Sequence, residues 1–447
     1  MSSGTADRAD FLKNPIVLLA IILAAGFVLR VFLSLFLTYE PDFNTWRVWG
    51  IQISASGFGK FYDRHWCDYM PGYLYILWAL DGINKAIPWF PMEILFKLPA
   101  NLADLGISAL IFLWVRGVAS AKTALICASA YFFNPAALSN STFWGQVDSF
   151  HAFPIMLSVF LGLRRKFFLS GLFIALAFMI KPQSIVVFPV VGLLAARSVL
   201  VPRLNFRLES ILPVILFLVA GALTIFIVSL PFIWDKLDSV TYAFTGPVEL
   251  IISRFQAAYG EYQFTSLNAF NVWGAVAMWA DDEIVKLGLA LRTWGTIAFM
   301  TFYAFAGCLL VFFTVVKSDV KRDYAYLVPE AITLILFALF LIVTRAHERH
   351  LLPAIAFFTL IVFRSWIFWC LYAIVSCVYV INMAYSHLQL VTKYSGVQTV
   401  LGISENLAKV YIWIMVLLYV AAFLVIFRDY VINAINYKKL IFPLRGN

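Results

Sequence analysis

A carboxylate at the end of the first long apolar run is one of several side chains in this sequence that are suited to chemistry. Asp42 follows that run directly, and the residues from Phe43 to Ile53 place large apolar side chains at helical spacing. This spacing predicts an amphipathic helix at a membrane surface, with the carboxylate at its N-terminus. Asp42 could simply cap that helix, or it could take part in catalysis or substrate binding.

Cations are densest between two apolar runs near residue 350, where the sequence reads Arg345, Ala346, His347, Glu348, Arg349, His350. Both arginines keep their charge and can hold phosphate oxygens through two hydrogen bonds each. A charged cap on two helices, with an internal Arg–Glu pair, is the alternative. The two histidines are three residues apart, which is not the spacing of the H-E-x-x-H zinc motif. The segment therefore predicts phosphate recognition.

A lysine lies inside an apolar stretch that runs from residue 167 to 196. Lys181 is followed there by Pro182 and Gln183. A charge in such a stretch is costly unless the side chain reaches the membrane surface or pairs with an anion. Both explanations remain open, and the second predicts a phosphate or carboxylate partner.

Further polar residues stand at predicted membrane boundaries. Asp68, before Tyr69 and the chain-breaking Pro71-Gly72, could orient a sugar hydroxyl, although a boundary turn with interfacial aromatic residues explains the motif equally well. Gln146 and Asp148 are predicted at a helix terminus, where they need water or a partner.

A pair of asparagines ends the longest polar segment of the chain. Asn268 and Asn271 are three residues apart, which predicts that they share one face of a helix. They could bind sugar hydroxyls, or they could pack against neighbouring loops.

These motifs interrupt a chain of 447 residues that is 63% hydrophobic and 13% charged. Soluble proteins are about half apolar and about a quarter charged, so the excess predicts one all-α, polytopic membrane domain over residues 1–447. Runs of roughly 17–25 apolar residues predict about twelve transmembrane helices. We expect them near 15–38, 93–115, 122–139, 149–163, 167–181, 183–197, 210–233, 288–315, 324–344, 350–364, 366–386 and 407–427. The first run is too long for a signal peptide and lacks a cleavage site.

Basic residues indicate the orientation of these helices. They fall mainly in alternate short loops and in the C-terminal tail, and the positive-inside rule places those loops and both termini in the cytoplasm. This orientation requires 71–88 to be re-entrant or interfacial, since a full crossing would reverse the order. The extracytoplasmic face then carries the loops 39–92 and 234–287 and nearly all the polar motifs. Because the net charge of +9 follows from topology, we expect no nucleic-acid partner.

Taken in order, the motifs resemble those of the GT-C superfamily of membrane glycosyltransferases, and most closely bacterial relatives of the mannosyltransferases of GPI-anchor synthesis. The matching motifs are Asp42-Phe43, Phe61-Tyr62, Asp68 to Tyr73, Trp144 to Asp148, Lys181-Pro182-Gln183, Asn268 to Asn271 and His347-Glu348-Arg349. Each motif is short, but together they extend over most of the chain. The family more often has two prolines after the Asp-Tyr pair, whereas this sequence has Met70 in place of the first.

The resemblance implies an inverting hexosyltransferase that moves a sugar, with mannose favoured, from a polyprenyl-phosphate donor to a hydroxyl of a glycan, glycolipid or protein. It implies that Asp42 is the general base and that Lys181, Arg345, His347 and Arg349 surround the donor phosphate. The other motif residues would bind substrate: Asp68, Tyr69, Gln146, Asp148, Gln183, Asn268, Asn271 and Glu348. No cofactor is required by this chemistry, although a divalent cation such as Mg or Mn could assist.

A polyprenyl-linked lipid or sugar flippase, or a transporter, is the alternative function. It also predicts many spans and buried charges, but its polar site should lie near the middle of the membrane. Here the polar motifs gather at one face. We therefore expect an enzyme of the bacterial plasma membrane with an extracytoplasmic active site.

Overall fold

The computed structural model describes residues 14–201, 204–237, 239–316, 324–395 and 403–441. In these ranges the chain is almost entirely helical, which confirms the all-α prediction. The elements in chain order are α2 (Pro15–Leu33), α3 (Glu40–Ser56), α4 (Phe58–Arg64), α5 (Pro71–Ala86), α6 (Met92–Arg116), α7 (Ala121–Phe132), α8 (Pro135–Ala137), η1 (Leu138–Trp144), α9 (Asp148–Leu163), α10 (Phe167–Ile180), η2 (Pro182–Val186), α11 (Phe188–Leu200), α12 (Leu208–Ile233), η3 (Trp234–Lys236), α13 (Val240–Glu261), β1 (Ser266–Leu267), α14 (Val272–Val276), β2 (Val285–Lys286), β3 (Leu289–Ala290), α15 (Leu291–Val311), η4 (Phe312–Val316), α16 (Tyr324–Ile342), β4 (Ala346–His347), α17 (Leu352–Thr359), η5 (Val362–Arg364), α18 (Trp366–Ser395) and α19 (Glu405–Ile441).

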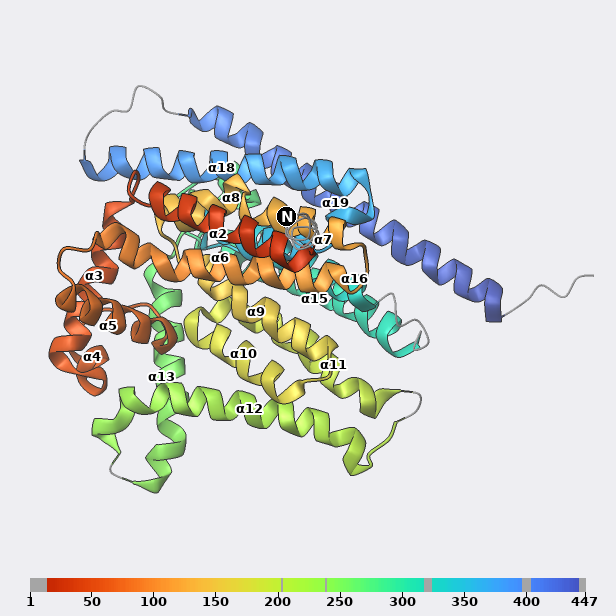
Figure 1. Cartoon of the computed structure of the whole chain (residues 1–447), viewed down its shortest axis with the longest axis horizontal. Helices are drawn as coiled ribbons and strands as arrows, with labels where there is room; N and C mark the ends of the chain where they lie inside the picture. Colours follow the sequence, from red (N-terminus) through yellow and green to blue (C-terminus); the bar gives the residue numbers. More distant parts are fainter. Residues whose placement is uncertain (1–13, 202–203, 238, 317–323, 396–402, 442–447) are drawn as a thin grey trace, which may run out of the picture.

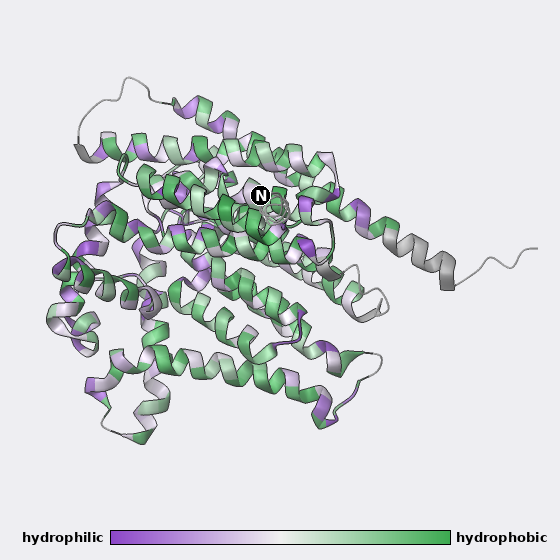
Figure 2. Cartoon of the chain, in the orientation of Figure 1, coloured by the Kyte–Doolittle hydropathy of each residue, from purple (hydrophilic) through white to green (hydrophobic). Residues whose placement is uncertain are grey.

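Seven helical segments of the described chain are long and apolar enough to cross a membrane. They are Pro15–Leu33, Met92–Arg116, Pro182–Leu200, Leu208–Lys236, Leu291–Thr314, Trp366–Lys393 and Glu405–Ile432. Shorter apolar helices lie between them at Asp148–Leu163, Phe167–Ile180, Tyr326–Ile342 and Leu352–Arg364. Figure 2 shows the hydrophobic colour along most of the length of these helices. The chain is an integral membrane protein, and the total of about twelve crossings stays a prediction.

The segment predicted as one span at 122–139 is broken into pieces. α7 ends at Phe132, and the side chain of Asn134 accepts a 2.7 Å hydrogen bond from the backbone N–H of Ala136 to cap α8. Pro135 lacks the N–H that a continuing helix would need, so a new helix begins there. α8 passes directly into the π-helix η1, a form that is rare and frequent at functional sites.

The long helices lie side by side, with α10 packed between α9 and α12, and α9 against α6 (Figure 1). α3, α4 and α5 gather at one end of these helices (Figure 1). The first turn of α5 packs on the end of α10, because a Cβ at Gly72 would lie only 2.5 Å from the carbonyl oxygen of Met179. This close approach, which only glycine permits, places the segment before α5 next to the segment after α10.

Two distant loops are joined by a short parallel pairing of β1 with β4, in which Ser266 lies opposite Ala346 and Leu267 opposite His347. An isolated antiparallel bridge between Asn268 and His347 lies next to this pairing. It connects the predicted loop 234–287, which also contains α13 and α14, to the segment between α16 and α17. The pairing therefore brings together two of the polar motifs that sequence analysis selected.

Candidate functional site

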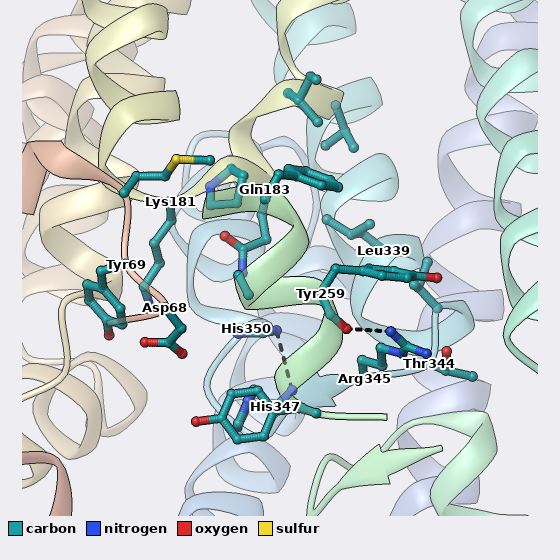
Figure 3. Close-up of a pocket in the computed structure, with 18 of the residues that line it drawn as sticks. Asp68, Tyr69, Lys181, Gln183, Tyr259, Leu339, Thr344, Arg345, His347 and His350 are labelled. Carbon is teal, nitrogen blue, oxygen red and sulfur yellow. Dashed lines mark hydrogen bonds between the residues drawn. The ribbon is translucent and has the colours of Figure 1, made fainter. Parts of the chain in front are cut away.

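A cavity of about 320 Å³ lies where the segments before α5 and α17 meet α13, α16 and the end of α10. Its lining includes polar and charged side chains, among them Asp68, Lys181, Arg349 and His350. Apolar side chains make up much of the rest: Ile180, Ile185, Val186, Phe255, Ala258, Leu339 and Val343. Figure 3 shows Lys181 and Asp68 on one side of the cavity and Arg345 with Tyr259 on the other. Such a cavity suits an amphiphile with an anionic head and a hydrocarbon chain.

Lys181 is buried and pairs with a carboxylate of the chain. α10 ends at Ile180, and the Lys181 Nζ lies 2.5 Å from Oδ1 of Asp148, the first residue of α9. The other carboxylate oxygen of Asp148 accepts a hydrogen bond of 3.1 Å from the side chain of Asn140. The pairing accounts for the burial of Lys181 without extension to the membrane surface. Lys181 also lines the cavity.

Arg349 lies at the centre of the charged groups. Its guanidinium is 2.9 Å from the carboxylate of Glu348, and its Nε has no hydrogen-bond partner among the described residues. Burial alone would lower the pKa of Arg349, but Glu348, and after it Asp42, outweigh burial and hold that pKa well above its usual value. Arg349 therefore stays charged, with hydrogen-bonding capacity left over.

Arg345 is engaged more fully than Arg349. Its Nε and one terminal nitrogen lie 2.7 and 2.8 Å from the two carboxylate oxygens of Asp282, and its plane stacks 4.0 Å from the ring centre of Tyr259. The third nitrogen donates to the Tyr259 carbonyl, as Figure 3 shows. Arg345 lines the cavity, but its fork joins the segment before α17 to the loop that holds Asp282.

The two histidines of this segment are neutral hydrogen-bonding groups. The backbone N–H of His347 donates to Nδ1 of His350 over 3.3 Å (Figure 3). Burial lowers the pKa of His347 well below its usual value and that of His350 to about 3, and nearby Lys181 and Arg349 act in the same direction. Each ring can donate one N–H to a phosphate or hydroxyl, but neither carries a charge.

Asp42 faces a second cavity of about 140 Å³, on the far side of Arg349. Its Oδ2 accepts a hydrogen bond of 2.9 Å from the indole N–H of Trp144 and another from the side chain of Gln146. Neither donor is a backbone group of α3, so Asp42 is held from outside its own helix. Arg349, His347 and Tyr262 line both cavities and form the wall between them. Asn268, Trp279 and Glu348 complete much of the second cavity.

Asp68 and Tyr69 lie between α4 and α5 and line the larger cavity. Burial raises the pKa of Asp68 to about 6, although Arg349 acts in the opposite direction. The loop is shaped by Arg254, which donates to the Cys67 carbonyl over 3.0 Å, and by Tyr62, which donates to the Tyr69 carbonyl over 2.8 Å. The structure thus brings Asp68 and Lys181, more than a hundred residues apart, to one cavity.

The prediction that Asn268 and Asn271 share one face of a helix is wrong. α14 begins only at Val272, and the β1–β4 pairing holds Asn268 in a left-handed conformation with φ of 58°. Asn268 accepts a hydrogen bond from the indole of Trp279 and lines the second cavity, whereas Asn271 caps α14 by accepting from the Gly274 N–H. Gln183 lines the larger cavity and lies near Lys181 in Figure 3.

Several charged residues of this region were not selected from the sequence. Arg30 and Asp104 form a buried pair 2.7 Å apart, and Lys97 is buried against the segment that leads into α3, the helix of Asp42. The sequence contains a signal for these residues, because Arg30, Lys97 and Asp104 all fall inside predicted spans, where an ionisable residue is costly. Asp282 gave no such signal, since it lies in an acidic run of a polar loop.

Among the described residues, no group of three or more His, Cys, Asp and Glu side chains is arranged to hold a metal ion. A scan against protein-family models and a search of curated proteins found no match to this chain. The two cavities and the groups that line them are therefore the features that indicate a function.

Proposed function

We propose that the protein is a glycosyltransferase that uses a polyprenyl-phosphate-sugar donor, with mannose the favoured sugar. The observation that carries the proposal is the larger cavity, which the cations Lys181 and Arg349 line together with many apolar side chains. This arrangement suits a phosphate attached to a hydrocarbon chain. A flippase could bind the same amphiphile, but it would not need a carboxylate behind the phosphate-binding arginine.

Asp42 is the carboxylate in that position and is the proposed general base. The acceptor hydroxyl occupies the second cavity and attacks the anomeric carbon from the side opposite the phosphate, so the configuration inverts. Its proton passes to the Asp42 carboxylate, and the bond between the anomeric carbon and the phosphate oxygen breaks with both electrons leaving on the phosphate. Proton removal by a positioned base typically contributes about 10²- to 10⁴-fold to the rate.

The leaving phosphate gains one negative charge in this step, and the cations of the larger cavity stabilise it. Arg349 is best placed because it lines both cavities and carries a positive charge. Lys181 contributes its ammonium, and His347 contributes an uncharged N–H donor. Arg345 also lines this cavity, but it contributes mainly by holding the loop of Asp282 in place. Asp68, Tyr69 and Gln183 line the cavity where the donor sugar would lie.

The surroundings follow from the same proposal. The site faces the extracytoplasmic side of a bacterial plasma membrane, both termini are cytoplasmic, and about twelve helices cross the bilayer in the manner of the GT-C enzymes. The acceptor is a glycan, glycolipid or protein hydroxyl. A divalent cation is not needed for the charge arrangement described, although Mg²⁺ or Mn²⁺ could assist.

The test is sugar transfer by the purified protein from radiolabelled polyprenyl-phosphate-mannose to a crude membrane acceptor extract, with and without Mg²⁺. Asp42→Asn should lose transfer by about 10²-fold or more while donor binding survives. Asp63→Asn is the matched control, because that carboxylate is exposed and pairs with Lys236. Transfer at the wild-type rate by Asp42→Asn would exclude the base assignment. Absence of both sugar transfer and donor hydrolysis with several polyprenyl-phosphate hexoses would favour the flippase. Translocation of the lipid in liposomes would then test that function.

A further inference from the structure

The most deeply buried cation near the proposed base is one that the reaction does not use. Lys97 lies in the first half of α6, and its side chain is 0% exposed. A buried ammonium in a membrane helix is costly, so its partners indicate what it does. Its Nζ donates to the carbonyl oxygen of Ser34 over 2.8 Å and to that of Leu37. These two carbonyls belong to the segment that connects α2 to α3, and α3 carries Asp42.

The same side chain also supports the groups that hold Asp42. Gly145 has a φ of 86°, and a Cβ at this position would lie 3.0 Å from Cγ of Lys97. Gly145 stands between Trp144 and Gln146, the two residues that donate to the Asp42 carboxylate. The aliphatic part of the Lys97 side chain thus packs against Gly145, between the two donors to Asp42. Its ammonium binds the segment that leads into α3.

Residues of α2 and α6 also hold η1, the π-helix that ends at Trp144. Arg30 donates to the hydroxyls of Ser141 and Thr142 over 3.2 and 3.1 Å, and Thr142 also donates to Asn101, one turn after Lys97 on α6. Asn101 in turn donates to the Ser34 hydroxyl over 3.3 Å. α6 therefore contacts both the segment between α2 and α3 and the segment around Trp144, through Asn101 and through Lys97. Of these two residues, Lys97 contacts Gly145, which lies between the two donors to Asp42.

We infer that Lys97 is a positioning residue for the base: it sets the place of Asp42 relative to Trp144 and Gln146 without touching substrate. The inference rests on the proposed function. A displacement of about 1 Å of a catalytic group can cost about 10²-fold in rate, even when the mutated residue is remote from the reaction. Donor binding depends on the other cavity, where Lys97 has no part, so it should be spared.

The experiment compares Lys97→Met with wild type, using the transfer assay and a separate measurement of donor affinity. Lys97→Met should lower kcat by about 10²-fold with the KM for donor within about twofold of wild type. Lys122→Met is the matched control, since that lysine is exposed at the start of α7, and it should transfer at the wild-type rate. A purely structural role would reduce the amount of folded protein but leave the kcat of the folded fraction unchanged.

A double-mutant cycle tests whether Lys97 acts through the holders of Asp42. Gln146→Leu removes one donor to the base, so Lys97→Met in that background should add much less than it costs alone. If Lys97→Met proves too unstable to purify, Gly145→Ala disturbs the same contact from the other side and should give the same split between kcat and KM. Additive losses, or equal losses in kcat and donor affinity, would overturn the inference. Absence of transfer by the wild type would overturn the proposed function and this inference with it.

Discussion

Lys181 and Asp148 form an ion pair of 2.5 Å in which both side chains are almost fully buried. Asp148 is the first residue of α9, and Lys181 follows the last residue of the neighbouring helix α10. Because Lys181 also lines the larger cavity, the pair both stabilises the junction of two helices and presents a cation to a ligand.

Removal of one member of this pair should destabilise the protein. Lys181→Met and Asp148→Asn should each cost about 3–5 kcal/mol of unfolding free energy, because each leaves the partner buried without compensation. The double variant should be clearly more stable than the sum of the single losses predicts. Thermal unfolding in detergent would measure all three proteins. Losses that add in the double variant would show that the two side chains do not depend on each other.

Substitution of Arg349 should weaken donor binding, whereas substitution of Arg345 should mainly destabilise the protein. Arg349→Ala should weaken donor binding on the order of 10- to 100-fold, as expected for the loss of charged hydrogen bonds to phosphate. Arg345→Ala should mainly lower the melting temperature, because it leaves the fully buried Asp282 unpaired. Donor binding by calorimetry and thermal unfolding, measured on both variants, would check this. Arg349→Lys keeps the charge without the fork and should fall between wild type and Arg349→Ala; equal donor affinity in Arg349→Ala and wild type would contradict the prediction.

Asp68 should make stability depend on pH. Burial raises the pKa of Asp68 in the folded state to about 6, above the value of 3.8 for an unperturbed carboxyl. Between these values the folded protein binds more protons than the unfolded chain, so the contribution of Asp68 to stability falls as pH rises from about 4 to 6. Asp68→Asn should therefore gain stability relative to wild type as pH rises, and the gain should level off above pH 6. Melting temperatures of the two proteins from pH 4 to 8 would test this; a difference that is constant with pH would refute it.

Some of this arrangement could be predicted from local sequence and some could not. The apolar context of Lys181 predicted an anionic partner, but which carboxylate it would be depends on how α9 and α10 pack. Asn268 and Asn271 were predicted on one helix face from their spacing. That prediction failed because a parallel pairing between β1 and β4, more than 70 residues apart, overrides local helical preference. The break at Pro135 had a local signal, since proline cannot continue a helix, but the long apolar run around it masked the signal.

The pair of Arg30 and Asp104 gives a last prediction, about residues inside the predicted spans. Arg30 is 1% exposed and lies 2.7 Å from Asp104, and it also donates to the backbone carbonyl of Phe132 over 2.6 Å. Tyr131 donates to the second oxygen of Asp104 over 2.7 Å. Arg30→Met should therefore cost about 3–5 kcal/mol, because Asp104 would remain buried with its charge uncompensated.

The matched control is Arg116→Met, which removes an exposed arginine at the end of α6 and should change stability by no more than about 0.5 kcal/mol. Arg30→Met with Asp104→Asn should recover part of the loss, since the uncompensated charge is then absent. Unfolding by heat in a matched detergent would measure the series. An unfolding free energy for Arg30→Met equal to that of Arg116→Met would show that water or lipid compensates Asp104. In that case the π-helix that carries Trp144 would not depend on Arg30.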